Sequence, residues 1–373
     1  MENKSALVMS LGARTTGENY GAILQMYCFC RVLEKRYQIN STIMDYVGVS
    51  ALGYKANDIA VGVVYGKAKS IKEKIKKWLF SGLIKKRYLN NLDFLRKEIG
   101  MTETISFQDI NSKKFNYDYY IAESDVIWDP TFRSTGFDDT FFLNRDSFQH
   151  GIKVVYAAGL GDCAFSREDI CTFKDKIKNI DFVSVREKMA TSFIGKHFSI
   201  DIPYVLDPTL LLDCNDYLFH KTRATKKDYV LVYSPGFYNK KMVADAKKYA
   251  HEHGKKIIIV KRAMSLEDFF VSKVNISVKR FVDLLDNCFT FFCDSFHGIC
   301  LSVVFRKQFY AYNRPDGLKM FDICERLSLT RRIVVDSLDD QDIDYDEVYK
   351  LLAKEREFSF SFLDRVFATL DSN

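Results

Sequence analysis

Residues 287–302 read NCFTFFCDSFHGICLS, and this stretch decides the fold class. The apolar residues 289–293 predict a buried strand, residues 294–298 a tight polar turn, and residues 298–305 an apolar helix. Strand–turn–helix units build the parallel sheets of α/β proteins, in which ligands lie beyond the carboxyl ends of the strands. The stretch therefore predicts an α/β sheet with a ligand site close to this turn.

The turn carries groups that are suited to anion binding and proton transfer. A helix that begins at Ser295 or Gly298 presents its first backbone N–H groups to an anion. His297 belongs to the residue type that exchanges a proton near neutral pH. The turn thus predicts an anion site with a proton donor. The alternative is a histidine that only fixes the turn by hydrogen bonds.

The composition indicates a globular chain, and its 373 residues are a length typical of two domains. Lys and Arg exceed Asp and Glu by 55 − 49 = 6, which is too small an excess to indicate a nucleic-acid partner. Nine cysteines without a pairing framework predict reduced thiols in a cytoplasmic protein. We expect no metal site, because no zinc-type ligand spacing occurs. No run approaches the roughly 20 apolar residues of a membrane span, and residues 6–13 suit a first buried strand better than a secretory leader.

Strand and helix patterns alternate along the chain, which predicts two Rossmann-like domains facing a cleft. We expect a first domain at 1–214, a second at 215–344 and a helical tail at 345–373. The expected strands cover residues 6–11, 41–46, 117–122, 152–158, 181–185, 229–234, 256–260, 289–293 and 308–312. The expected helices cover residues 22–37, 240–253, 278–286 and 298–305.

Residues 66–88 interrupt this alternation with nine cations and a single acid, Glu73, among apolar side chains that include Trp78. A basic amphipathic segment of this kind suits an anionic membrane surface. The alternative is a solvated helical excursion, near residues 66–100, that packs by its aromatic side.

Five short motifs follow one another along most of the chain. They are GENYGA at 17–22, SDVIW at 124–128, SVREK at 184–188, VLDPT at 205–209 and DSFHG at 294–298. In sequence and order they resemble the motifs of the polysaccharide pyruvyl transferases. The resemblance implies a GT-B-like pair of domains, with the tail crossing back to the first domain. It also implies transfer of pyruvate from phosphoenolpyruvate to a sugar of a bacterial-type surface polysaccharide or its precursor, closed into a ketal. Such acceptors are often lipid-linked, which favours the membrane interpretation of residues 66–88.

The resemblance and the chemistry of phosphoenolpyruvate suggest roles for individual residues, with no further cofactor. The methylene carbon must be protonated, and His297 is the candidate acid, while Asp125 and Glu18 are candidate carboxylates for the acceptor. A guanidinium just past a strand can hold phosphate or carboxylate by two hydrogen bonds. The residues expected to bind substrate are Arg186, Ser295, Phe296, Gly298, Asn19, Arg314 and Lys319. Turn, cap or ion-pair duties are the alternatives for the residues outside the DSFHG turn.

Two other functions stay open. A GT-B glycosyltransferase would hold a nucleotide sugar in the second domain, with Glu325 as a loose candidate for the ribose. A non-catalytic glycan-binding protein would explain Glu123, Val126 and Lys319, where the family usually has glycine, glutamine and arginine. The acceptor sugar, its carrier and the oligomeric state are not predicted by the sequence.

Overall fold

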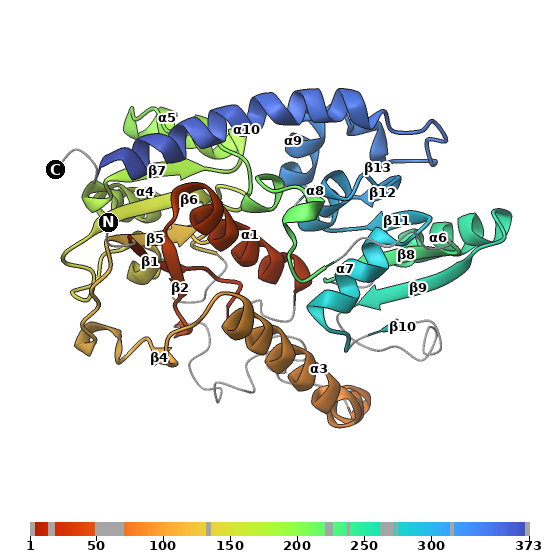
Figure 1. The fold of residues 1–373 in the computed structure, drawn as a ribbon, viewed down its shortest axis with the longest axis horizontal. Helices are drawn as coiled ribbons and strands as arrows, with labels where there is room; N and C mark the ends of the chain where they lie inside the picture. Colours follow the sequence, from red (N-terminus) through yellow and green to blue (C-terminus); the bar gives the residue numbers. More distant parts are fainter. Residues whose placement is uncertain are drawn as a thin grey trace.

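The computed structural model describes residues 4–13, 19–48, 71–131, 136–220, 227–236, 239–261, 272–273, 275–313 and 317–369. Two parallel sheets lie beside each other with helices around them (Figure 1). This is the expected α/β architecture of two Rossmann-like halves, and its GT-B-like arrangement is confirmed. Part of the predicted connector before the second sheet, residues 221–226, lies outside the described residues.

The first sheet has the strand order β2-β1-β5-β6-β7, and all neighbours are parallel. Its strands are β1 (Ser5–Met9), β2 (Asn40–Ile43), β5 (Tyr119–Glu123), β6 (Ile152–Ala158) and β7 (Phe182–Val185). A short pair, β3 (Tyr46–Val47) and β4 (Ile105–Ser106), lies apart from it. The helices of this half are α1 (Tyr20–Tyr37), α3 (Ile71–Glu98), α4 (Arg167–Lys176) and α5 (Lys188–Phe198). The order reverses between β1 and β5, which marks a switch point where ligands bind in such sheets.

The second sheet has the order β10-β9-β8-β11-β12-β13, again all parallel. Its strands are β8 (Tyr229–Ser234), β9 (Lys256–Lys261), β10 (Ser272–Lys273), β11 (Thr290–Cys293), β12 (Phe309–Tyr312) and β13 (Ile333–Val334). Its helices are α6 (Lys240–Glu252), α7 (Val278–Asp286), α8 (Phe296–Val304) and α9 (Leu318–Arg326). The switch point of this order lies between β8 and β11, directly before the DSFHG motif.

The tail forms one continuous helix, α10 (Tyr345–Ala368), which runs along both halves (Figure 1). At its start, Tyr345 donates to the carbonyl of Ser302 in α8 at 3.0 Å. Near its end, Asp364 accepts from Arg36 at 3.0 Å and from Tyr37 at 2.8 Å, both at the end of α1. The expected return of the tail to the first domain is therefore confirmed.

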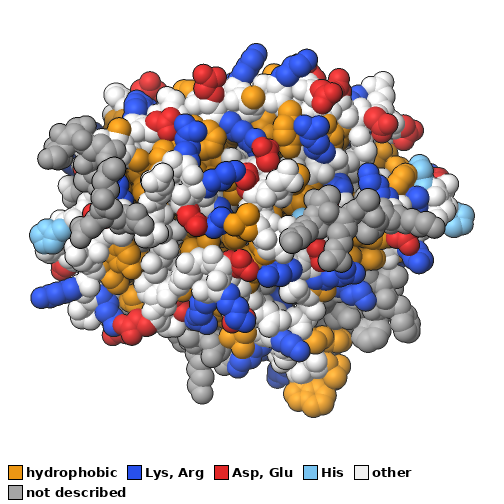
Figure 2. Space-filling view, in the orientation of Figure 1, with side chains coloured by type: hydrophobic (Ala, Val, Ile, Leu, Met, Phe, Trp, Pro, Cys, Tyr) orange, Lys and Arg blue, Asp and Glu red, His pale blue; other side chains and the backbone are white. Residues whose placement is uncertain are grey.

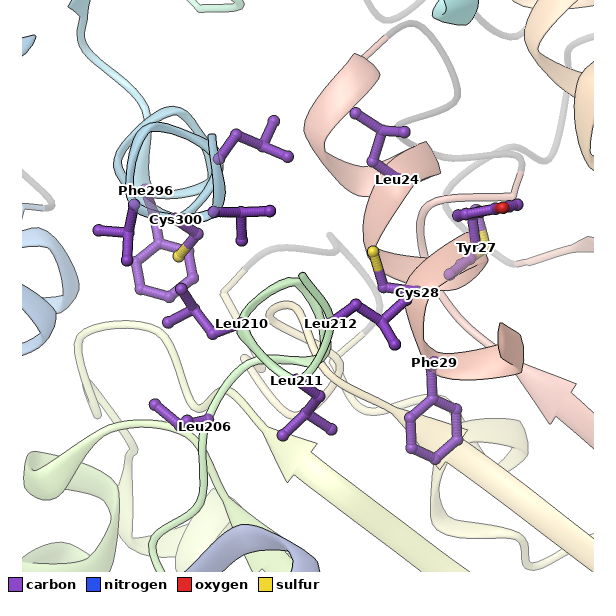
Figure 3. Close-up of a cluster of buried hydrophobic side chains, with 14 of the residues drawn as sticks. Leu24, Tyr27, Cys28, Phe29, Leu206, Leu210, Leu211, Leu212, Phe296 and Cys300 are labelled. Atoms are coloured by element: carbon purple, nitrogen blue, oxygen red, sulfur yellow. The ribbon is translucent and has the colours of Figure 1, made fainter. Parts of the chain in front are cut away.

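The segment that joins the two halves is buried between α1 and α8 (Figure 3). Leu206, Leu210 and their neighbours contact the apolar faces of both helices, and one continuous hydrophobic cluster includes residues of both halves. A shared core of this kind fixes how the two switch points face each other, because close-packed interiors resist relative displacement.

The helix of the DSFHG motif opens at Ser295, one of its two predicted starting points. The expected helix at 298–305 begins two residues earlier, at Phe296, so that His297 and Gly298 lie in its first turn. Ser295 is the N-cap, and its hydroxyl accepts from the N–H of Gly298. A serine cap satisfies one of the free N–H groups of a helix start, which is why the helix begins here.

Candidate functional site

The N-terminal ends of α1 and α8 bring the two switch points together. Gly21 makes this contact possible, because a Cβ at that position would lie 2.4 Å from the Cβ of His297. Asn19 caps α1 by accepting from the N–H of Gly21 at 2.9 Å. The same side-chain oxygen accepts from Tyr233 at the end of β8 at 2.7 Å. The N-cap residue of α1 in the first half is thus hydrogen-bonded to strand β8 of the second half.

His297 is held by a hydrogen-bond relay from the first sheet. Its Nε2 donates to Oε1 of Gln25 at 2.7 Å, and Nε2 of Gln25 donates to Oε2 of Glu123 at 2.9 Å. Burial raises the pKa of Glu123 well above its ordinary value, although the hydrogen bond from Gln25 opposes this. The relay fixes the ring of His297 and occupies Nε2, while Nδ1 makes no hydrogen bond to a described residue.

Asp207 lies at the centre of the junction. Its Oδ2 accepts from Nη1 of Arg186 at 3.0 Å and from Oγ of Ser124 at 2.9 Å, and lies 3.7 Å from Nε2 of His297. Burial opposes ionisation of this carboxyl, but the interactions with His297 and Arg186 outweigh it and hold the pKa of Asp207 well below its usual range. A buried anion therefore lies beside the imidazole ring of His297.

Arg186 is buried and largely occupied by protein groups. Besides Asp207, it donates through Nε to Oε1 of Glu187 at 2.9 Å and through Nη1 to Ser124 at 3.2 Å. Its guanidinium carbon lies 4.6 Å from the ring centre of Phe296. Burial alone would lower the pKa of Arg186, but the neighbouring carboxylates raise it above its ordinary value. Nη2 makes no hydrogen bond to a described residue, so this nitrogen can still bind a ligand.

Two adjoining cavities open at this junction. The smaller, of about 80 Å³, is lined by Asn19, Asp125, Arg186, Pro235, Asp294, Ser295, Phe296, His297, Lys319 and Met320. The larger, of about 410 Å³, shares Asn19, Asp125 and Lys319 with it. The structure thus brings seven of the ten predicted site residues to one small cavity. Glu18 and Arg314 lie outside the described residues.

Gly298 lines neither of the two cavities, in contrast to its expected role as an anion contact. Its N–H is directed to Ser295 Oγ at 3.4 Å. A Cβ at this position would lie 2.9 Å from Sγ of Cys293, so the glycine allows α8 to pack tightly on β11.

Asp125 takes part in the local turn and also lies at the cavities. Its Oδ1 accepts from the N–H of Val126 at 3.0 Å, and the residue also lines both cavities. Ser124 and Asp125 both have positive φ, of 42° and 52°. Non-glycine residues in this region carry backbone strain, which often accompanies functional sites.

No site role was predicted for Gln25, Glu123 or Asp207. Gln25 was detectable as a single polar residue within the apolar run of α1, and Glu123 as an acid at the end of a buried strand. Asp207 lies in the quoted VLDPT motif. Among the described residues, no group of three or more His, Cys, Asp or Glu side chains could hold a metal ion.

The sequence model of the polysaccharide pyruvyl transferases matches residues 19–316. The chain belongs to this family. The matched range contains α1, Asp207, α8 and the described residues of the smaller cavity except Lys319 and Met320. Membership identifies a transferase of polysaccharide biosynthesis. No curated protein sequence is significantly similar to the chain.

Several solved structures have a similar fold at low sequence identity. The S. aureus MnaA–UDP structure is 10% identical, with 99% of this chain and 97% of that chain covered and a TM-score of 0.45. UDP-N-acetylglucosamine 2-epimerase from Rickettsia bellii is 13% identical over 100% of both chains, with a TM-score of 0.41. E. coli heptosyltransferase WaaC, with ADP-2-deoxy-2-fluoro heptose, is 9% identical and has a TM-score of 0.36. The match covers 83% of this chain and 89% of that chain. Likenesses this weak carry no information on activity or ligand.

Proposed function

We propose that this pyruvyl transferase takes phosphoenolpyruvate as donor and closes the pyruvate into a ketal on a sugar of a surface polysaccharide or its precursor. The observation that carries the proposal is the small cavity at the start of α8, which joins His297, Arg186 and Lys319. It combines cations, helix N–H groups and a proton donor in a space of about 80 Å³, suited to a small anion.

The donor would be held by its two anionic groups. The first N–H groups of α8 and Nη2 of Arg186 would contact one of them, and Lys319 the other. No cofactor beyond the donor enters the reaction as proposed. Of the seven predicted residues that line this cavity, all except Asp125 would bind or activate the donor.

His297 would act as the acid through Nδ1, since Nε2 is occupied by Gln25. Its proton moves to the methylene carbon, which becomes a methyl group and leaves positive charge at C2. One sugar hydroxyl adds to C2, and a second displaces the phosphate to close the ketal. Of the two hydroxyl protons, one restores His297 and the other leaves with the phosphate. Asp207 stabilises the imidazolium before the transfer, and Asp125 is the proposed base for the hydroxyls.

Turnover tests the proposal directly. Phosphoenolpyruvate is mixed with the protein and a pool of lipid-linked and nucleotide-linked sugars, and phosphate release is followed together with the methyl proton signal of the product. We expect both signals to appear in equal amounts and to fall by about a hundredfold or more with His297→Gln. Phosphate release without a ketal methyl signal would rule out ketal formation.

We also propose that α3 contacts an anionic membrane, which would place the enzyme in the cytoplasm at the inner membrane face. Among the described residues, no helix is long and apolar enough to cross a membrane. However, the first half of α3 exposes an apolar stripe at helical spacing. This stripe consists of Ile71, Ile75, Trp78, Leu79 and Leu83, with Trp78 80% exposed. An apolar patch with cations beside it is visible over the start of α3 (Figure 2).

The charge of this segment favours a lipid surface over a protein partner. Lys74 and Lys86 are exposed beside the stripe, and basic residues outnumber acids along it. Apolar insertion combined with attraction to anionic lipids is typical of interfacial helices.

We expect the protein to co-sediment with vesicles that contain phosphatidylglycerol, and we expect Trp78→Ser and added salt to weaken this binding. Phe358→Ser, an exposed apolar residue of α10, is the matched control. Equal binding of the protein to anionic and to neutral vesicles would refute the contact. Equal vesicle binding by the wild-type protein and the Trp78→Ser variant would refute it as well.

A further inference from the structure

The larger cavity is strongly acidic. The described residues that line it include six acids and one base, Lys319. The acids are Asp125, Asp129, Asp162, Glu187, Asp322 and Glu325. Among the described residues, no three of these acids lie close enough together to hold a metal ion. Their charges are therefore spread around the cavity. A space of about 410 Å³ is large enough for a sugar unit.

Glu187 gives evidence for a ligand that does not depend on the number of acids in the cavity lining. It is the N-cap residue of α5, but its side chain makes no cap hydrogen bond. Only Oε1 is bonded, to Arg186, while Oε2 is buried without a partner in the described part of the chain. The residue is 7% exposed and lines the cavity. A buried carboxylate oxygen without a donor is costly, and a ligand N–H or O–H would relieve this cost.

The surroundings of Glu187 connect it to the cavity. Burial raises its pKa, whereas the charges of Arg186 and Lys319 lower it, and Asp322 is close enough to raise it further. Lys319 and Asp322 both line the cavity. The carboxylate of Glu187 therefore belongs to the electrostatic environment that a ligand in this space would meet.

The rest of the lining suits a carbohydrate ring. Leu318 and Phe321 are exposed apolar residues on the wall formed by α9, and Val126 and Met189 lie on the side of the first sheet. Ligand sites commonly combine apolar walls with a few polar groups that fix orientation. Lys319 and Asp125, which line both cavities, would then stand where donor and acceptor meet.

We propose that the larger cavity binds the acceptor sugar and selects against negative charge: it takes neutral sugars, favours amino sugars, and rejects uronic acids. An ammonium or hydroxyl group of the sugar donates to Oε2 of Glu187. A carboxylate on the ring would instead be brought among six acids and be repelled. The inference rests on the proposed function only in taking the larger cavity as the acceptor side.

The test measures binding, separately from turnover. Methyl galactoside, galactosamine and galacturonic acid are titrated into the full-length protein without phosphoenolpyruvate, and phosphoenolpyruvate is titrated in a separate experiment. We expect galactosamine to bind more tightly than methyl galactoside, and galacturonic acid at least about tenfold more weakly. Glu187→Gln should reduce the preference for galactosamine several-fold. Glu325→Gln, at an exposed position, should relax the rejection of galacturonic acid without risk to folding.

Glu347→Gln, an exposed acid at the start of α10, is the control and should change nothing. Equal binding of the three sugars, unchanged selectivity in both cavity variants, or no binding of any sugar would overturn the inference. If phosphoenolpyruvate alone does not bind while the sugar order holds, the donor proposal fails and the charge selection stands.

Discussion

Nε2 of His297 lies 2.7 Å from Oε1 of Gln25, a hydrogen bond that joins α8 of the second sheet to α1 of the first. The two residues are 272 positions apart in the chain. The candidate acid is thus oriented by the opposite half of the molecule, and its geometry depends on how the two halves pack.

Replacing Gln25 by methionine removes this hydrogen bond while keeping the side-chain volume. We expect kcat to fall by about 10- to 100-fold, because the ring loses its fixed orientation, with little change in the KM for phosphoenolpyruvate. Steady-state kinetics over a pH series measure both quantities. Leu24→Met, a volume-conserving change on the same helix, should leave kcat nearly unchanged. A Gln25→Met enzyme with wild-type kcat would show that the relay has no positioning role.

Gly21→Ala should separate the two halves at the site. The added Cβ would lie 2.4 Å from Cβ of His297, so α1 or α8 must move. We expect a loss of stability of about 1–3 kcal/mol and loss of activity, read by denaturant unfolding and turnover. Gly82→Ala in α3 is the matched control, because a Cβ there meets nothing within 4 Å. That change should stabilise the protein by about 0.5–1 kcal/mol.

Replacing Arg186 by lysine keeps the positive charge, but a lysine cannot donate hydrogen bonds to Glu187, Ser124 and Asp207 at the same time. We expect unfolding free energy to drop by up to about 3 kcal/mol, because buried carboxylates lose partners. Arg36→Lys, in the exposed pair with Asp364, should cost no more than about 1 kcal/mol. Equal effects of the two variants in urea unfolding would contradict the central place of Arg186 in the junction.

Glu123→Gln should change how stability depends on pH. Burial raises the pKa of Glu123 in the folded state, so the folded protein favours the neutral carboxyl. The contribution of this group to stability is therefore full below its unfolded pKa and is lost as the pH rises through the folded pKa. The glutamine variant, which can still accept from Gln25, should be more stable than wild type at high pH, by about 1 kcal/mol. Parallel melting curves from pH 4 to 9 would show this as a reduced slope; an unchanged slope would mean that Glu123 ionises normally.

The sequence predicted the strand–helix alternation well, because buried parallel strands are continuous apolar runs such as residues 152–158 and 229–234. It also predicted site roles for His297, Arg186 and Lys319; the structure brings the three to one cavity, and the roles stay predictions. It did not predict that Arg186 would be engaged by Asp207 and Glu187, since such contacts depend on tertiary packing. The role of Gln25 was invisible for the same reason: its partners lie on β5 and α8.

The start of α8 shows a second limit of prediction from the sequence. The sequence Ser-Phe-His-Gly at 295–298 is compatible with a turn and with a capped helix start, and the hydrogen bond from the N–H of Gly298 to Ser295 decides for the helix. The loop residue Glu18 and the cation Arg314 were predicted at the cleft, and they stay predictions, since both lie outside the described residues.

The most direct test is calorimetric titration of phosphoenolpyruvate into the wild-type protein and into Lys319→Met and His297→Gln, with UDP titrated in parallel. Lys319 lines both cavities and makes none of the hydrogen bonds that hold Arg186, so we expect its loss to leave the fold intact. We predict saturable binding of phosphoenolpyruvate, weakened about tenfold or more by Lys319→Met and less by His297→Gln. Binding of UDP without binding of phosphoenolpyruvate would contradict the account.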